Sequence, residues 1–388
     1  LFSILTVTVN MFMFRRCVGR LQNIGGKSFS SSSSSPSNTI APVCIDYAKL
    51  VDRNSDLSSE IEQAYGQKGL GILTVKNIPD FMSKRLTLLP MARQVGLLSD
   101  QEKSKIEHAA SSYQVGWSHG KEKFNGKPDL AKGSYYANPE YDSPKAEGAV
   151  YVPNIWPTDS LPKFEGAFKD LGCEMIRVGT LLAVHIDKFV SSKLGSEYKE
   201  NCLEDVIKSS GSHVGRLLHY FPQNSTGKDE PWCGWHNDHG SLTALTCALY
   251  TEQASGRELT KEERSKALSN NETGLFIQSR SGEIVKAVIP DDHLAFQIGE
   301  TSQIMSGGWL QATPHSVQIK GDLSKISRNT LAVFMEPLPS MPLGNAIWPR
   351  EVVERVCVDY PMVPSLGKRW RPGQKFEQFH HATVAEFY

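Results

Sequence analysis

Residues 235–249 read WHNDHGSLTALTCAL, a polar segment with two histidines and one aspartate followed by a run rich in apolar and β-branched residues. The run predicts a strand that begins near Ser241. His236 and Asp238 stand where this strand should begin. Because residues two apart on a strand share a face, we expect both side chains to reach one ion. A single His-x-Asp pair is weak on its own, since it also arises by chance in a chain of this size.

Six further short apolar runs flank this one, separated by Gly, Pro, Asn or Asp. They read VGRLLHYF (214–221), GLFIQ (274–278), EIVKAVI (283–289), LAFQI (294–298), HSVQI (315–319) and NTLAVFM (329–335). Strands of this length at this spacing predict a barrel or a sandwich. Residues 251–274 are charged and lack a strand pattern, so we expect an insertion that projects from the sheet.

A third ligand is expected from a distant strand, because a barrel brings separated strands together around one opening. His315 begins such a strand. Two histidines and one carboxylate form a facial triad with open coordination positions, the arrangement of non-haem Fe(II) oxygenases. The same triad can also hold Zn²⁺ with an activated water, so both metals remain open at this point.

Arg328 and Thr330 lie on the next predicted strand, two positions apart and therefore on one face. A guanidinium fork beside a hydroxyl is a well-formed receptor for a carboxylate. This pair favours an oxygenase that uses a carboxylate co-substrate, because a zinc hydrolase has no clear use for it.

Three segments together resemble the Fe(II)- and 2-oxoglutarate-dependent dioxygenase superfamily, in particular its plant-type and isopenicillin-N-synthase-like branch. HNDHGSLTAL (236–245) resembles the H-T-D-x-G-x-L-T segment of that branch. QIGETSQIMSGGWLQATPHSV (297–317) resembles its I-G-D…SNGxxxSxxHRV segment, and SRNTLAVFMEP (327–337) resembles its R-x-S-x-x-x-F segment. The resemblance covers about residues 214–337.

The resemblance implies an α+β fold with a double-stranded β-helix (jelly-roll, cupin-like) core flanked by α-helices. It implies Fe(II) on His236, Asp238 and His315, and the distal carboxylate of 2-oxoglutarate on Arg328 and Thr330. The activity implied is an oxidoreductase of the dioxygenase type, which oxidises a C–H bond of a small organic substrate with O₂ and forms succinate and CO₂. Ascorbate is expected to support turnover.

The chain departs from the family pattern at several positions. Thr330 stands where serine is usual, and LLHYFP (217–222) stands where the branch often has N-Y-Y-P. His219 thus replaces the asparagine and is predicted as a weaker co-substrate contact. Aromatic candidates for the pocket, each also compatible with ordinary core packing, are Trp117, Tyr135, Tyr136 and Trp235.

A second His-x-Asp pair, His185 and Asp187, lies in a stretch with helical periodicity from Leu161 to Phe189. Residues two apart on a helix point in different directions, so this pair is not expected to chelate one ion. His239 lies out of phase with His236, and we expect it to form hydrogen bonds rather than to bind metal.

The predicted organisation has four parts. Residues 1–42 are a transit peptide or a disordered tail, 43–210 a helical and loop region, 211–338 the barrel with its insertion 251–274, and 339–388 a C-terminal cap. Within the second part we expect a helix over 57–69, a strand over 71–75 and long loops over 100–157. The first part contains arginines and a serine run but no acidic residue before Asp46, which favours targeting to a mitochondrion or plastid; otherwise a cytoplasmic protein is expected.

Composition excludes several classes of protein. The 42 basic and 42 acidic residues among 388 leave no positive excess for nucleic acid. The apolar run 1–14 is too short and too interrupted for a membrane span. The seven cysteines are dispersed without any C-x-x-C pair, which favours reduced thiols. We expect a monomer with a small-molecule substrate; the alternatives are a zinc-dependent hydrolase and a non-catalytic binding or sensing barrel.

Overall fold

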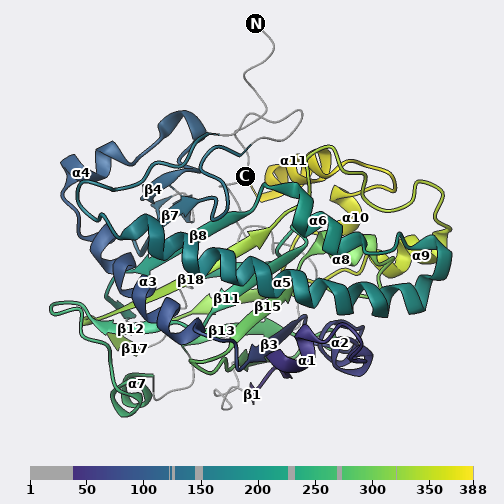
Figure 1. Cartoon of the computed structure of the whole chain (residues 1–388), viewed down its shortest axis with the longest axis horizontal. Helices are drawn as coiled ribbons and strands as arrows, with labels where there is room; N and C mark the ends of the chain where they lie inside the picture. Colours follow the sequence, from purple (N-terminus) through teal and green to yellow (C-terminus); the bar gives the residue numbers. More distant parts are fainter. Residues whose placement is uncertain are drawn as a thin grey trace, which may run out of the picture.

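The computed structural model describes residues 38–121, 123–124, 127–144, 152–225, 232–268, 273–319 and 321–387. Its centre is a jelly-roll core built from a larger and a smaller sheet, with α-helices around it (Figure 1). The α+β class predicted from the sequence is therefore confirmed. In order across the larger sheet, the strands are β2 (Val43–Asp46), β3 (Ile72–Lys76), β15 (Leu294–Ile298), β11 (Leu242–Thr246), β18 (Ile326–Met335), β8 (Val214–Tyr220), β7 (Lys132–Ala137) and β4 (Gly116–His119), with β12 (Leu249–Glu252) also paired to β18.

The smaller sheet contributes two of the predicted metal ligands. Its strands, in order, are β1 (Asn38–Ile40), β14 (Ile284–Ala287), β13 (Gly274–Gln278), β16 (His315–Gln318) and β10 (Cys233–His236). Two short ribbons, β9 (Gln223–Ser225) with β17 (Gly321–Leu323) and β5 (Lys123–Phe124) with β6 (Lys127–Pro128), complete the described strands. Each of the seven predicted apolar runs contains a strand.

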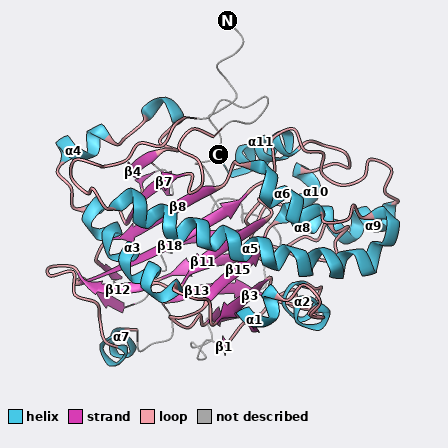
Figure 2. Ribbon diagram, viewed as in Figure 1, coloured by secondary structure: helices cyan, strands magenta, loops and turns pink. Residues whose placement is uncertain are grey.

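The long helix α5 (Phe164–Leu194) crosses the larger sheet (Figure 2). Apolar side chains at steps of three and four give it one continuous buried face. Gly179 allows a close approach, because a Cβ there would lie 2.5 Å from Cε of Met335. The helix begins three residues later and ends five residues later than the predicted range 161–189, and it shares one hydrophobic core with the barrel strands.

The N-terminal region packs beside α5. It contains α1 (Tyr47–Val51), α2 (Ser58–Tyr65) and α3 (Phe81–Gly96). After α5 the chain continues into η2 (Gly195–Glu197) and α6 (Cys202–Ser210). Helix α2 is shorter than the predicted range 57–69, because Gly66 ends it.

The prediction of long loops over 100–157 was wrong in part. This stretch contains α4 (Asp100–Lys105), η1 (Ala109–Ser111) and the sheet strands β4 and β7. Every residue of β7 is buried, so both of its faces are covered and no alternation of polar and apolar residues marks it as a strand.

The insertion also begins later than predicted. Thr251 and Glu252 complete β12, and the charged segment then forms α7 (Lys261–Ala267), which starts with a capping box between Thr260 and Glu263. Residues 269–272, the rest of the predicted insertion before Thr273, lie outside the described residues.

The C-terminal segment folds over one end of the barrel. It contains α9 (Arg350–Val356), α10 (Leu366–Arg369) and α11 (Phe376–Phe387), which share a small apolar cluster with Ile304 of α8 (Glu300–Met305). The predicted tail 1–42 lies outside the described residues except for 38–42. No helix in the described part of the chain is long and apolar enough to span a membrane.

Candidate active site

Three buried side chains meet at one end of the barrel. His236 ends β10 and His315 begins β16, and the two residues are direct partners across these strands. Nε2 of His236 lies 3.6 Å from Oδ1 of Asp238, and Nε2 of His315 lies 3.8 Å from the same oxygen. Each of the three residues offers one ligand atom, and these atoms lie within 4.8 Å of one another.

The structure corrects the reason given for the pairing of His236 with Asp238. Strand β10 ends at His236, and Asp238 lies in the turn that precedes β11. The carboxylate reaches the imidazole because the chain turns there, and the alternation of side chains along a strand has no part in it. Placing the pair at the start of one strand was therefore wrong, although the two side chains do meet.

Hydrogen bonds on the far side of each imidazole set its tautomer. Nδ1 of His236 lies 2.8 Å from the Gly234 carbonyl oxygen, and Nδ1 of His315 lies 3.2 Å from that of Thr313. A carbonyl can only accept, so each Nδ1 donates to it, and Nε2 is the nitrogen of each ring that faces Asp238. The side-chain amide of Gln297 packs against the same ring nitrogen of His315, at 2.6 Å.

The protonation of the two imidazoles differs strongly. Burial, followed by the charge of His236, lowers the pKa of His315 to about 4. Burial also acts to lower the pKa of His236, but the Cys233 thiol and the Asp238 carboxylate outweigh it and raise that pKa to about 9. A cation at Nε2 must therefore displace a proton from His236, which makes metal affinity depend on pH.

The donor set fits a divalent transition metal. Two imidazole nitrogens and one carboxylate oxygen converge, and all three residues are 4–5% exposed. Three such ligands on one side leave positions for a co-substrate and for a further ligand. His236, Asp238 and His315 are the residues that would hold Fe(II).

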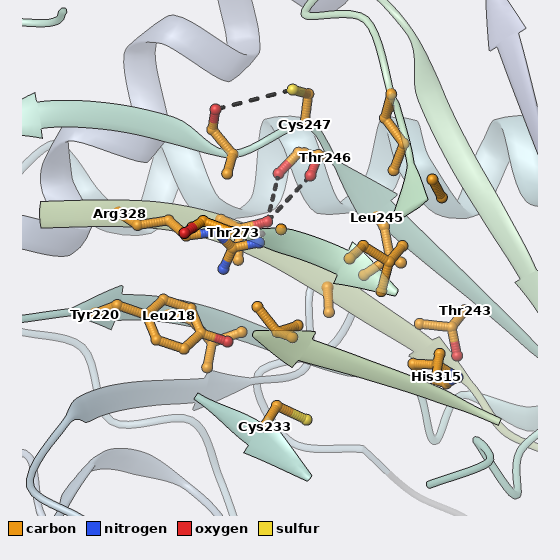
Figure 3. A pocket seen from close by; sticks show the side chains of 18 of the residues that line it. Leu218, Tyr220, Cys233, Thr243, Leu245, Thr246, Cys247, Thr273, His315 and Arg328 are labelled. Atoms are coloured by element: carbon orange, nitrogen blue, oxygen red, sulfur yellow. Dashed lines mark hydrogen bonds between the residues drawn. The ribbon is translucent and has the colours of Figure 1, made fainter. Parts of the chain in front are cut away.

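Arg328 lies in the same cavity as the triad. The cavity has a volume of about 270 Å³, roughly that of nine water molecules in the liquid. Figure 3 shows Arg328 and Tyr220 toward one end of it and His315 toward the other. A small dicarboxylate therefore has room between the guanidinium and the triad.

The guanidinium of Arg328 is ready for an anion. The side chain is buried, and its Nε and Nη1 have no hydrogen-bond partner within the described part of the chain. The guanidinium carbon lies 4.7 Å from the centre of the Tyr220 ring and 5.8 Å from that of Trp232, so aromatic faces hold it in place. Buried N–H groups without partners are costly, and a bound carboxylate would provide an acceptor for them.

The hydroxyl of Thr330 also lines this cavity. Its Oγ1 lies 3.1 Å from the Thr246 carbonyl oxygen and 3.2 Å from the Thr246 hydroxyl. When the Thr330 hydroxyl donates its proton to that carbonyl, its oxygen can still accept a hydrogen bond.

Comparison with known proteins gives a consistent result. Residues 43–159 match the family described as non-haem dioxygenase in morphine synthesis N-terminal. The fold is similar to that of solved Fe(II)- and 2-oxoglutarate-dependent oxygenases, at low sequence identity. No curated protein sequence matches the chain.

Three solved structures illustrate this superfamily likeness. A Caulobacter crescentus protein of the 2OG-Fe(II) oxygenase family has a TM-score of 0.65 at 15% identity, covering 91% of this chain and 100% of its own. A full-length Neurospora crassa protein in complex with alpha-KG has a TM-score of 0.57 at 17% identity, covering 82% and 90%. The auxin oxidation dioxygenase DAO1 of Arabidopsis thaliana, in complex with 2-oxoglutarate, has a TM-score of 0.53 at 17% identity, covering 77% and 93%.

The predicted co-substrate role of His219 does not fit its position. Leu218 and Tyr220 line the cavity, whereas His219 lies on the opposite face of β8. A Cβ on Gly96 of α3 would lie 2.8 Å from the His219 ring, and Nδ1 of His219 donates to Asn329 Oδ1 at 2.7 Å. His219 is therefore a packing residue between the sheet and α3.

Tyr220 is the residue that the sequence argument missed. It is the direct cross-strand partner of Arg328, and both side chains line the cavity. The strand β8 is buried on both faces, so its sequence shows no alternation from which the phase could be read. The position of Arg328 could have identified Tyr220, because residues paired directly across two strands lie on the same face of the sheet.

The remaining sequence candidates lie elsewhere. Nε2 of His185 lies 2.9 Å from the Leu50 carbonyl oxygen, and Asp187 accepts hydrogen bonds from the Tyr198 hydroxyl and the N–H groups of Leu203 and Glu204. His239 forms a hydrogen bond, as expected. The aromatic candidates that do not line the cavity are Trp117, Tyr135, Tyr136 and Trp235.

Proposed function

We propose that this protein is a non-haem Fe(II)- and 2-oxoglutarate-dependent oxygenase that oxidises a C–H bond of a small organic substrate. Bound iron and 2-oxoglutarate would supply the oxidising chemistry, with O₂ consumed and succinate and CO₂ released. The observation that carries the proposal is the placement of the His-Asp-His triad and the unsatisfied Arg328 fork in one cavity.

The residues of the chain have separate tasks in this proposal. Arg328 binds the distal carboxylate of the co-substrate, and Tyr220 and Trp232 hold the guanidinium in the orientation that presents Nε and Nη1. Burial of the triad keeps bulk water from the reacting centre. Apolar lining residues available to position the substrate are Leu245, Leu275, Val317, Ala332 and Phe334.

Two other functions were considered from the sequence. A zinc-dependent hydrolase would use the triad but would leave the buried Nε and Nη1 of Arg328 without partners. A non-catalytic binding barrel would need no complete set of metal ligands, yet all three are in place. The geometry favours the oxygenase over both.

Metal analysis and succinate release test the proposal together. Protein purified without oxygen should retain iron, bind 2-oxoglutarate and release succinate slowly when Fe(II), ascorbate and O₂ are present. Asp238→Ala should lose all three properties, whereas the matched helix variant His185→Gln should keep them. Stoichiometric zinc without 2-oxoglutarate binding would indicate the hydrolase, and tight 2-oxoglutarate binding without succinate would indicate the binding barrel.

The substrate is then sought by comparative metabolite profiling. Small-molecule extracts incubated with the protein, iron, ascorbate and 2-oxoglutarate should show a compound that gains the mass of one oxygen or loses two hydrogens. Heat-treated protein and the Asp238→Ala variant serve as controls. Targeting of residues 1–42 to a mitochondrion or plastid and a monomeric state belong to the same proposal, and fluorescent fusion and light scattering test them.

A further inference from the structure

The residue between two triad members is tied to the C-terminal segment. Asn237, which does not line the cavity, donates its side-chain amide to Glu300 Oε1 at 3.0 Å. Glu300 begins α8, and its carboxylate forms a two-fold contact with Arg369 of α10, at 2.6 Å to Oε1 and 2.7 Å to Oε2. Asn237, Glu300 and Arg369 therefore form one buried polar chain, which we name the loop brace.

The ion pair in this brace is fully enclosed. The side chains of Glu300 and Arg369 are each 2% exposed. Arg369 also donates to the Thr383 hydroxyl of α11 at 2.9 Å and to the Pro364 carbonyl oxygen at 3.0 Å. Burying two charges costs free energy, and apolar residues of similar size often stabilise a protein equally well. A buried ion pair with a third partner therefore suggests a positioning role.

The backbone of the metal-binding turn rests on the same helix. The Glu300 N–H donates to the Asp238 carbonyl oxygen at 2.8 Å, and the Thr301 hydroxyl donates to that of His239 at 2.7 Å. The contact is close enough that a Cβ on Gly299 would lie 2.1 Å from the Gly240 carbonyl oxygen. Helix α8 therefore supports the turn that carries Asp238, so a shift of Glu300 would also move that turn.

A second contact links the turn to α11. Nε2 of His239 lies 2.6 Å from Nδ1 of His380, and both side chains are buried. The ring of His239 also stacks on Phe376, with centroids 5.8 Å apart and planes inclined by 5°. The C-terminal segment thus contacts residues on both sides of Asp238.

We propose that the loop brace positions the turn 236–238 for metal binding, so that Asn237, Glu300 and Arg369 are positioning residues for the ligands His236 and Asp238. This inference rests on the proposed metal site. Partners of metal ligands typically change metal affinity by about 10- to 100-fold when they are removed. A brace that served stability alone would leave that affinity unchanged.

The first test measures Mn²⁺ binding to the full chain by calorimetry, because Mn²⁺ is stable in air and its binding needs no turnover. Asn237→Ala removes the link to the turn and leaves the Glu300–Arg369 pair intact. We expect about a tenfold loss of Mn²⁺ affinity with a small change in melting temperature. The matched control is Asn138→Ala, which removes a buried asparagine bonded to the Gly211 carbonyl oxygen and should leave Mn²⁺ affinity unchanged.

The second test asks whether Arg369 acts through Asn237. Arg369→Met should lower Mn²⁺ affinity. The double variant with Asn237→Ala should bind Mn²⁺ little less tightly than the single variant that binds it less well, because both changes break one chain of contacts. If Arg369→Met does not fold, Thr383→Val removes one hydrogen bond to Arg369 and replaces it in the cycle.

Three results would overturn the inference. Parental Mn²⁺ affinity in Asn237→Ala would give the brace a structural role only, and an equal loss in Asn138→Ala would show a general effect of destabilisation. Losses that multiply in the double variant would separate Arg369 from Asn237. A parent protein that binds no Mn²⁺ or Fe(II) would instead overturn the metal site, and the proposed function with it.

Discussion

Arg328 and Tyr220 are direct partners across β18 and β8, with the guanidinium carbon 4.7 Å from the centre of the tyrosine ring. Both side chains line the cavity that also contains the triad. The ring packs against the guanidinium, and Nε and Nη1 have no protein partner among the described residues. These N–H groups can donate to an anion, and a guanidinium can bind a carboxylate with two parallel hydrogen bonds when Nη2 takes part.

Arg328→Lys keeps the charge but loses the planar fork. We expect weaker 2-oxoglutarate binding by about 1 to 3 kcal/mol, or roughly five- to 150-fold, the range for a charge-assisted hydrogen bond. Bound iron should hardly change, since the triad is untouched. Calorimetry with 2-oxoglutarate and metal analysis measure both quantities. Thr330→Ser is the control that keeps the hydroxyl; if Arg328→Lys binds as tightly as the parent, the carboxylate lies elsewhere.

Tyr220→Leu removes the ring that holds Arg328. A buried cation–π contact contributes about 0.5 to 2 kcal/mol, so 2-oxoglutarate affinity should fall about two- to 30-fold. His219→Gln, on the opposite face of the same strand, should leave that affinity unchanged and alter only the melting temperature. The two variants are compared in one titration series, and a larger loss for His219→Gln would reverse the assigned faces of β8.

The seven predicted strands were recognisable because each has an apolar or β-branched run bounded by turn residues. Strands β4 and β7 were missed because the surrounding sequence is polar and β7 is buried on both faces, which removes the alternation on which strand prediction depends. The same reason explains the choice of His219 over Tyr220 on β8. Arg369, which comes from the C-terminal segment, had no sequence signal, because its role arises from a contact with Glu300, 69 positions away in the chain.

Replacement of His236, Asp238 or His315 by alanine should abolish stoichiometric metal binding. Their ligand atoms lie within 4.8 Å of one another, so each removal leaves only two protein ligands. His185→Gln should retain metal, because its Nε2 faces the Leu50 carbonyl oxygen. Asp187→Ala should also retain metal but unfold more easily, since three hydrogen bonds to its carboxylate are lost. Anaerobic iron titration measures the first property and thermal unfolding the second; iron retained by His236→Ala would contradict the assignment.

Limited proteolysis should cut the segment between Arg257 and Lys266 early. Most side chains there are exposed, and the ion pair between Arg257 and Glu263 is accessible to solvent. Arg264 should resist longer, because both ends of its guanidinium bind Asp291 at 2.6 and 2.8 Å. Mass spectrometry of the first fragments identifies the sites. Early cleavage inside β11, which is buried and central in the larger sheet, would mean that the sheet opens before the insertion does.

Stability should fall as the pH decreases from 6.5 toward 4, and two histidines outside the triad contribute. Burial lowers the pKa of His213 and of His219 to about 4. In the unfolded chain each titrates near its ordinary value of about 6.5. Between these values the unfolded chain binds a proton that the folded chain does not, so the free energy of unfolding decreases as the pH falls.

Burial determines this direction, because the hydrogen-bond partners of both rings favour the proton. Nε2 of His213 lies 2.8 Å from the Ile207 carbonyl oxygen and 3.8 Å from a Glu140 carboxylate oxygen, whose own pKa is raised by burial. For His219, the hydrogen bond to Asn329 favours the proton, but burial outweighs it, and the positive charge of Arg93 adds to the effect of burial. Both imidazoles are therefore neutral in the folded protein at pH 7.

Urea unfolding at pH 7 and pH 5 measures this dependence. Each histidine should contribute a loss of up to about 2 kcal/mol over that interval, since one pH unit corresponds to about 1.4 kcal/mol. The double variant His213→Gln/His219→Gln keeps amide donors in both places and cannot titrate, so its stability should change less between the two pH values. A double variant with the same pH dependence as the parent would show that these histidines are already protonated, or hydrated, in the folded state.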